Sequence, residues 1–221
     1  MMTKKIILFL LIVNSGVYCI SQEKLLTKNL KISKSLKIKQ QTYKLDATTS
    51  MNEGLIIIEG DNITVDFNNA ILKGSNQEKN PDKFFGVAIS IRAGSNITIK
   101  NLKARGYKVA LLAQNIRNLT IENCDFSYNY RRHLNSTQEK EDVSDWLSHH
   151  QNENDEWLRY GAAMYLRDCE FATIRNSKVT GGQNALLMTN CNRGKIYNND
   201  FSFNSGLGIG MYRSSFNVIA Y

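Results

Sequence analysis

The sequence predicts an all-β protein wound into a parallel β-helix, a solenoid whose coils are about 22 residues long. Two observations predict this fold. Ile174 and Ile196 lie 22 residues apart, and so do Cys169 and Cys191. The residues between them form short strand-like runs separated by Asn, Gly, Ser and Asp, without the apolar spacing of a helix. A chain that repeats at such an interval buries its apolar residues by stacking successive coils.

Residues 1–21 are predicted to be a secretory signal peptide. Lys4 and Lys5 precede an uninterrupted apolar run, 6–13, and small or short residues follow it. The run is too short to span a bilayer, and cleavage is expected near 19–22. We therefore expect a secreted or periplasmic protein with no membrane span after signal removal. A retained N-terminal anchor is the alternative; a lipid anchor on Cys19 is disfavoured by the bulky Tyr18 before it.

The composition restricts the partners. Lys and Arg number 28 against 20 Asp and Glu, a formal charge of +8 that falls to +6 without Lys4 and Lys5. Such a surplus is modest for a nucleic-acid protein, and an exported basic protein is expected to meet an acidic polymer or an anionic surface. The cysteines outside the signal are odd in number and form no CxxC or zinc-like Cys/His spacing: Cys124, Cys169 and Cys191.

The chain after the signal divides into two parts. Residues 22–54 contain the alternating pieces LKISKSLKIK and TYKL, which predict strands of an N-terminal cap or first irregular coil. Residues 55–221 are predicted to form the regular β-helix. Its repeats share an Ile-x-Asn core, and a second strand precedes each core. The asparagines of these cores are Asn101, Asn123, Asn176 and Asn198. A leucine-rich horseshoe is the competing repeat, but the return segments FSYNY and FSFNSG have strand and turn chemistry rather than helical periodicity.

Two insertions break the period. Residues 75–86 contain the only proline, and the longer insertion spans 130–160. Insertions in a solenoid form loops on its flank, and such loops frequently carry function.

A family resemblance covers nearly everything after about residue 30. The segments NITVDFNNAILKG and YNNDFSFNSGLGIGMYRSSFNVI, with the Ile-x-Asn cores between them, resemble right-handed, single-stranded parallel β-helix proteins of the pectin-lyase-like fold, with repeats of the carbohydrate-binding and sugar-hydrolysis type. The resemblance implies secreted or periplasmic proteins that bind, cleave or epimerise polysaccharides. One branch resembles the periplasmic accessory protein of nitrous-oxide-reductase maturation, which implies a non-catalytic scaffold as the alternative function. The fold alone does not decide between them.

The repeat places several side chains in register. The core asparagines are expected to form a buried amide ladder, and Cys169 and Cys191 a stacked buried pair, with a disulfide as the alternative. If Ile91, Leu112, Leu166 and Met188 point inward, an outward row follows on the same strands. That row is Arg92, Tyr165, Arg167, Met211 and Arg213. Arginines pair with carboxylates and aromatic rings stack on sugars, so the row is either an acidic-glycan track or a face covered by the insertion.

The 130–160 insertion concentrates the reactive side chains, including every His and Trp of the chain. Carboxylates near imidazoles suit acid–base chemistry on a sugar ring. The predicted catalytic residues are Asp145, His149, His150 and Glu156. The predicted substrate-binding residues are Trp146 and Trp157 with Tyr165, Arg92, Arg167 and Arg213. In this hypothesis the insertion folds over the outward strand face. The alternative is that the tryptophans only pin the insertion to the coil while the acids are solvated.

No cofactor or metal is predicted. Calcium is possible but unsupported: Asp125, Lys178 and Asp200 occupy equivalent positions, yet no tight cluster of acids appears, and copper is weaker still. The expected function is binding or processing of an acidic polysaccharide, by lyase, hydrolase or epimerase chemistry if the protein is an enzyme. The last repeat copy, FNVIAY, is unfinished, so missing C-terminal coils or a partner are expected to cover the open end.

Overall fold

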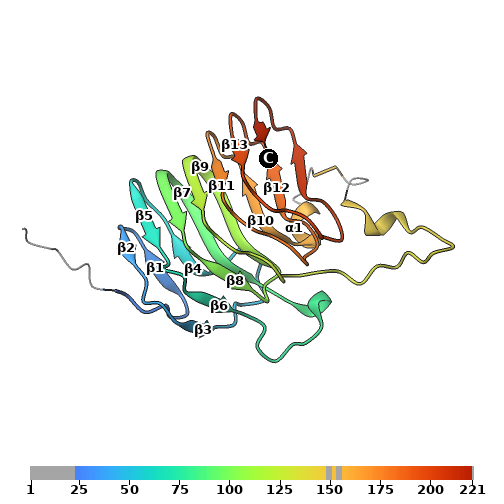
Figure 1. Cartoon of the computed structure of the whole chain (residues 1–221), viewed down its shortest axis with the longest axis horizontal. Helices are drawn as coiled ribbons and strands as arrows, with labels where there is room; N and C mark the ends of the chain where they lie inside the picture. The colour runs from blue at the N-terminus through green and yellow to red at the C-terminus, as the bar shows by residue number, and fades with distance from the viewer. Residues whose placement is uncertain (1–22, 148–150, 153–155, 221) are drawn as a thin grey trace, which may run out of the picture.

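The chain is an all-β protein dominated by parallel strands, and a computed structural model describes its residues 23–147, 151–152 and 156–220. Equivalent strands of successive coils lie side by side along the molecule, as β4, β7, β10 and β12 show (Figure 1). The strands are β1 (Leu30–Ile32), β2 (Leu36–Lys37), β3 (Thr42–Lys44), β4 (Gly54–Ile58), β5 (Ile63–Asp66), β6 (Ile71–Lys73), β7 (Val87–Lys100), β8 (Lys103–Arg105), β9 (Val109–Glu122), β10 (Ala162–Arg167), β11 (Thr173–Arg175), β12 (Leu186–Thr189), β13 (Lys195–Tyr197), β14 (Ile209–Tyr212) and β15 (Val218–Ala220).

The pairing register reproduces the sequence period. In the larger sheet, β1, β4, β7, β9, β10, β12 and β14 pair in that order, and each neighbouring pair is parallel. The cores Ile99, Ile121, Ile174 and Ile196 pair one above another on neighbouring coils. A smaller sheet is formed by β3, β6 and β8. The prediction of an all-β chain with parallel strands in register is confirmed, and the arrangement is consistent with a β-solenoid.

Apolar side chains from successive coils fill the interior. Ile56, Ile89, Leu111, Met164 and Leu186 are fully buried on one row. The sequence prediction assigned Leu112 to the inward face and Met211 to the outward one, and both assignments are wrong. Ala113 pairs with Ile91 and Leu166 and takes the inward place, whereas Leu112 pairs with Ser90 and Tyr165 and faces outward. Met211 pairs with the buried Met188 and belongs to the inward row.

The Ile-x-Asn asparagines do not form a buried ladder. Asn101, Asn123, Asn176 and Asn198 have φ values between 51° and 58°, and the last three are exposed. Asparagine tolerates this left-handed backbone better than most residues, so its role there is to turn the coil at a corner. Side-chain amides link neighbouring coils elsewhere: Asn199 Nδ2 donates to the Ile174 carbonyl while Asn199 Oδ1 accepts from Ser177 N–H.

Cys169 and Cys191 lie in the core on neighbouring coils and are not bridged. Their thiols interact with each other, and Cys169 and Cys191 Sγ also donate to the Arg167 and Thr189 carbonyls. The hydrogen bond between the thiols, together with burial, raises the pKa of Cys169. The pair is therefore a stacked element of the core, as the sequence favoured.

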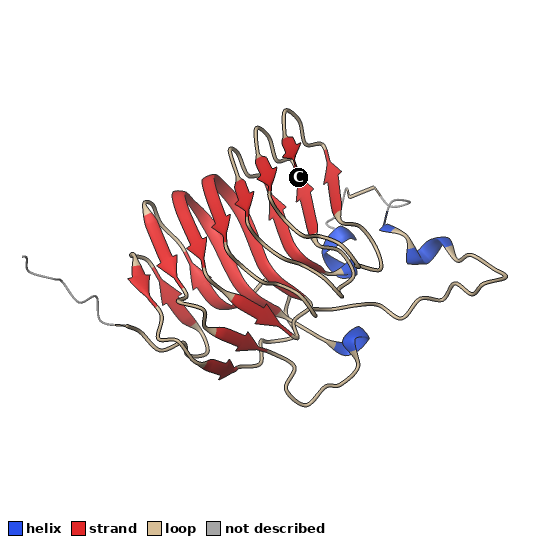
Figure 2. Cartoon of the chain, viewed as in Figure 1, coloured by secondary structure: helices blue, strands red, loops and turns tan. Residues whose placement is uncertain are grey.

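The insertion leaves the coil after β9 and returns through a short helix (Figure 2). It contains the 3-10 turn η2 (Val143–Asp145) and the helix α1 (Glu156–Tyr160), which leads directly into β10. The shorter insertion carries the 3-10 turn η1 (Pro81–Lys83). The predicted signal peptide, 1–21, and the predicted catalytic residues His149 and His150 lie outside the described residues. Within the described part, no helix is long and apolar enough to cross a membrane.

Candidate functional site

The outward face of β9, β10 and β12 is covered by the insertion, and we call it the covered face. Its buried side chains Leu112, Tyr165 and Leu187 pack with Leu147 and Trp157 from the insertion. The ring of Trp157 also lies 5.8 Å from that of Tyr212, measured between centroids. The insertion thus folds over the strand face that the sequence indicated, and it does so by forming a second apolar cluster.

The two rings predicted to bind sugar are buried in this cluster. Trp157 is 5% exposed and Tyr165 1%. The Tyr165 hydroxyl accepts from Asn152 Nδ2 at 2.7 Å and lies 3.1 Å from Thr189 Oγ1, while Asn152 Oδ1 accepts from Trp157 N–H. Neither ring offers an open face for stacking in this arrangement. Their contacts are those expected if the insertion is pinned to the coil.

Asp145 is engaged in holding the insertion together. The residue is 1% exposed, its carboxylate accepts hydrogen bonds from Asn135 N–H, Ser136 N–H and Ser136 Oγ, and Arg132 Nη2 lies 3.8 Å away. Burial raises the pKa of Asp145, but these hydrogen bonds and the arginine outweigh burial and leave the pKa below its ordinary value. A carboxylate held ionised with its oxygens occupied is a poor general acid. Glu156, the other predicted acid, is half-buried in the first turn of α1.

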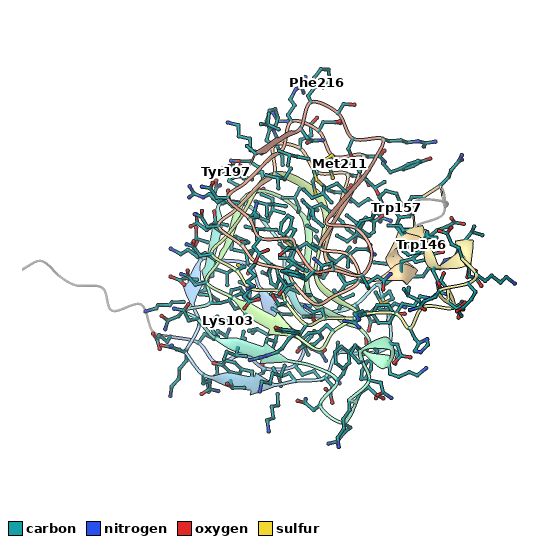
Figure 3. The ribbon with its side chains drawn as sticks, turned by 45° about the vertical axis from the view of Figure 1, so that its right-hand side comes forward. Lys103, Trp146, Trp157, Tyr197, Met211 and Phe216 are labelled. Carbon is teal, nitrogen blue, oxygen red and sulfur yellow. The ribbon has the colours of Figure 1, made fainter. Side chains whose placement is uncertain are left out.

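Trp146 is the predicted ring that lines an open hollow. A space of about 220 Å³ lies between Trp146, Leu147, Gln183, Asn184 and Leu207. The indole Nε1 is buried and has no hydrogen-bond partner among the described residues. Figure 3 shows Trp146 and Trp157 together on the insertion side of the coil.

The three predicted arginines do not form one row. Arg92 and Arg167 both pair with Gln114 and so stand two coils apart on the same row. Arg92 donates to Ser90 Oγ and to the Asn52 carbonyl, and Arg167 lies 3.6 Å from Asp168. The next coils place Thr189 and then Tyr212 on this row. Because the step from Thr189 to Tyr212 is 23 residues rather than 22, Arg213 falls on the following turn, where its guanidinium lies over the Tyr212 ring.

A different face carries unpaired positive charge, and sequence analysis missed it. Lys44, Lys73 and Arg105 stand directly opposite one another on β3, β6 and β8, and Lys103 adjoins them on the next outward position of β8. We call these four residues the cationic face. No ion pair involving any of them is found within the described chain. Like charges opposite each other across strands are destabilising, so a row of three cations favours an anion.

A groove runs beside the cationic face. One hollow of about 360 Å³ lies between the 74–81 segment and the coil, and a second of about 150 Å³ adjoins it; Arg105 and Tyr128 line both. Tyr128 is 62% exposed. A side chain at Gly181, where φ is 69°, would come within 2.9 Å of the Tyr128 ring, so this glycine lets the ring lie flat. Arg105 Nε is buried there without a hydrogen-bond partner in the described part of the structure.

The predicted row of Asp125, Lys178 and Asp200 is present, and Lys103 begins it. Both aspartates accept from a serine N–H two residues on, Ser127 and Ser202, which is the contact of a turn. Lys178 Nζ lies 3.6 Å from Asp200 Oδ2. Among the described residues, no group of three or more His, Cys, Asp or Glu side chains is arranged to hold a metal ion.

The class defined by this geometry is an all-β protein of stacked parallel strands with a covered face and an open cationic face. No known protein family matches the sequence, and no curated protein does. Among solved structures, the chain is similar to a "putative glycosyl hydrolase" from Parabacteroides merdae, with 12% identity and a TM-score of 0.50 over 84% of this chain and 80% of that one. At this identity the similarity concerns the fold alone.

Proposed function

We propose that this protein is an exported right-handed parallel β-helix that binds an acidic polysaccharide along its cationic face. The observation that carries the proposal is the register of Lys44, Lys73 and Arg105 on three neighbouring strands. The glycosyl hydrolase named for the structural neighbour supports a carbohydrate ligand, and the signal-like 1–21 segment supports a secreted or periplasmic location.

The spacing of the cations suits a polymer. Neighbouring parallel strands lie about 4.8 Å apart, so the row presents positive charge at short regular intervals. A polyuronate or a sulfated glycan carries anionic groups at regular intervals along its chain. Arg105 can bind a carboxylate bidentately, whereas the lysines act as point charges. The exposed ring of Tyr128 lines the adjoining groove and provides an apolar surface for a sugar face.

The cationic face is assigned to binding of the polysaccharide, and an experiment decides whether the protein also cleaves or epimerises it. Lyase, hydrolase or epimerase chemistry requires a group that transfers a proton next to the bound sugar. The titratable side chains at the groove are those of Lys73, Glu78, Lys103, Arg105, Asp125 and Tyr128. Release of shortened or unsaturated oligosaccharides from a bound polymer would establish an enzyme; binding without such release would establish a lectin-like protein.

The test compares two triple variants of equal net charge. Lys44→Gln with Lys73→Gln and Lys103→Gln removes charge from the cationic face. Lys31→Gln with Lys34→Gln and Lys195→Gln removes the same charge from exposed positions elsewhere. Calorimetric titration with polygalacturonate should show roughly tenfold weaker binding for the first triple, since three exposed ion pairs are together worth about one factor of ten. The control triple should bind like the wild type.

Two results would overturn the proposal. Equal weakening in both triples would mean that the polymer responds to net charge rather than to this face. Wild-type protein that binds neither polyuronates nor sulfated glycans would exclude the ligand class and favour the non-catalytic accessory alternative.

A further inference from the structure

A second cluster of cations lies where the long insertion leaves and re-enters the coil. A hollow of about 360 Å³ is lined there by Tyr130, Arg132, Ser144, Arg159 and Tyr160, which we call the arginine pocket. Tyr130 is anchored by its N–H to the Tyr107 carbonyl, and Tyr160 ends α1 just before β10. Both ends of the insertion therefore contribute a ring and an arginine to one hollow.

The charges in the arginine pocket are only partly balanced. The guanidinium carbons of Arg132 and Arg159 lie 5.9 Å and 5.6 Å from the Tyr160 ring centroid, and Lys108 Nζ lies 5.1 Å from that of Tyr130. Arg132 also lies 3.8 Å from Asp145, whose oxygens already accept from Asn135 and Ser136. Arg159 is exposed, and no ion pair of it is found within the described chain.

A half-buried lysine adds to the excess of positive charge at the arginine pocket. Lys108 is half-buried between the coil and the Tyr130 ring, and desolvation lowers its pKa. No ion pair of Lys108 is found among the described residues. A ligand that brings a negative charge to this cluster would be attracted by two guanidinium groups and an ammonium group at once.

The arginine pocket is connected with the groove beside the cationic face. A hollow of about 350 Å³ shares Arg132 with the arginine pocket and Pro81 with the groove, and Arg131 and His133 line it as well. Arg131 N–H donates to the Pro81 carbonyl, so the two insertions touch at this point. The hollows thus follow one another from the smaller sheet to the base of the long insertion.

We propose that the arginine pocket binds a second acidic sugar of the same polysaccharide chain, so that the protein selects long chains over short ones. This inference rests on the proposed function. Arg159 and Arg132 hold the carboxylate or sulfate of that sugar, and the rings of Tyr130 and Tyr160 border its apolar face. A disaccharide reaches only one of the two places, whereas a longer oligomer spans both and gains from the second contact as a linked binding event.

The test uses Arg159→Gln in the full chain, with Arg193→Gln as the matched control. Arg193 is also exposed and lies over an aromatic ring, 5.7 Å from the Phe171 centroid, on another corner of the coil. Affinities for a galacturonate disaccharide and a decasaccharide are measured by calorimetry. A decasaccharide contains several overlapping disaccharide units, and this statistical factor alone makes it bind more tightly than a disaccharide. Beyond that factor, the wild type and Arg193→Gln should bind the decasaccharide about tenfold more tightly. Arg159→Gln should lose this advantage and keep the affinity for the disaccharide. A sulfated decasaccharide, measured in parallel, identifies which acidic group is preferred.

The outcomes separate this inference from the proposed function. If the cationic-face triple weakens disaccharide binding while Arg159→Gln keeps the full long-chain advantage, the arginine pocket is not a subsite and the cationic face stands. If the wild type binds neither oligomer, both proposals fail. Equal loss of disaccharide and decasaccharide affinity in Arg159→Gln would also overturn the two-place arrangement.

Discussion

The covered face and the cationic face are built by different coils of the same stack, β9, β10 and β12 for the first and β3, β6 and β8 for the second, and differ in what their outward positions carry. On the covered face these positions hold Leu112, Tyr165 and Leu187, and the insertion buries them. On the cationic face they hold Lys44, Lys73 and Arg105, and no segment of the described chain neutralises them. Figure 3 shows Lys103 and the two tryptophans on different sides of the coil. An apolar outward row thus requires a cover, whereas a charged row stays open and needs an ion.

The largest expected loss of stability comes from a variant that disrupts the covered face. Trp157→Ala removes a ring that is 5% exposed, contacts Tyr212 and would lie 3.7 Å from a β-carbon added at Gly210. Truncation of a buried Trp costs about 3–5 kcal/mol in free energy of unfolding. Tyr128→Ala, on the open face, removes a ring that is 62% exposed and should change stability by less than about 0.5 kcal/mol. Urea unfolding followed by circular dichroism measures both.

The pair of variants also tests the sugar-platform hypothesis for Trp157. If Trp157→Ala proves as mild as Tyr128→Ala, the ring is not a structural anchor, and an insertion that opens to admit a glycan becomes the better description. If the costs differ as expected while only Tyr128→Ala weakens polysaccharide binding, the functional ring lies on the open face.

The repeat made the register of the core predictable, because Ile99, Ile121, Ile174 and Ile196 recur with the coil and face inward wherever the coil is regular. The same logic failed where the coil length changes by one residue, as at Arg213. The cations Lys44, Lys73 and Arg105 are 29 and 32 residues apart, so no fixed period relates them. Only the spatial pairing of β3, β6 and β8 brings them together. The sequence did contain one signal for the cationic face, since each of these short strands ends in Lys or Arg.

The insertion shows a second limit of sequence reasoning. Its Trp content predicted contact with the strand face, and that contact is present. Composition could not tell whether the rings would face a ligand or the coil, because both uses require an apolar surface. Asp145 was likewise indistinguishable from a catalytic acid until its donors Asn135 and Ser136 were located.

A smaller effect is expected from the polar centre of the covered face. Tyr165→Phe removes the hydroxyl that accepts from Asn152 at 2.7 Å and contacts Thr189 at 3.1 Å. Loss of a partner for buried polar groups costs about 1–3 kcal/mol. Tyr128→Phe removes an exposed hydroxyl instead and should leave the urea midpoint unchanged. A neutral Tyr165→Phe would mean that Asn152 and Thr189, which also bond to each other at 2.8 Å, satisfy one another without the tyrosine.

The smallest expected effect concerns the cationic face without its ligand, and its sign is opposite to that of the other variants. Lys73 stands between Lys44 and Arg105, so Lys73→Gln removes two unfavourable contacts and should stabilise the free protein by roughly 0.2–1 kcal/mol at low ionic strength. Because exposed charges are screened by salt, the gain should shrink as the salt concentration approaches about 1 M. Lys31→Gln is the control, since Lys31 pairs with the uncharged Ile57 on the neighbouring strand, and it should show neither gain nor salt dependence.

The same Lys73→Gln variant should bind polygalacturonate more weakly than wild type, which separates a functional charge from an accidental one. Urea midpoints at low and high salt, with binding measured in the low-salt buffer, provide the comparison. A Lys73→Gln protein that is no more stable than Lys31→Gln at low salt would show that the row carries little mutual repulsion, and the argument that it favours an anion would lose its basis.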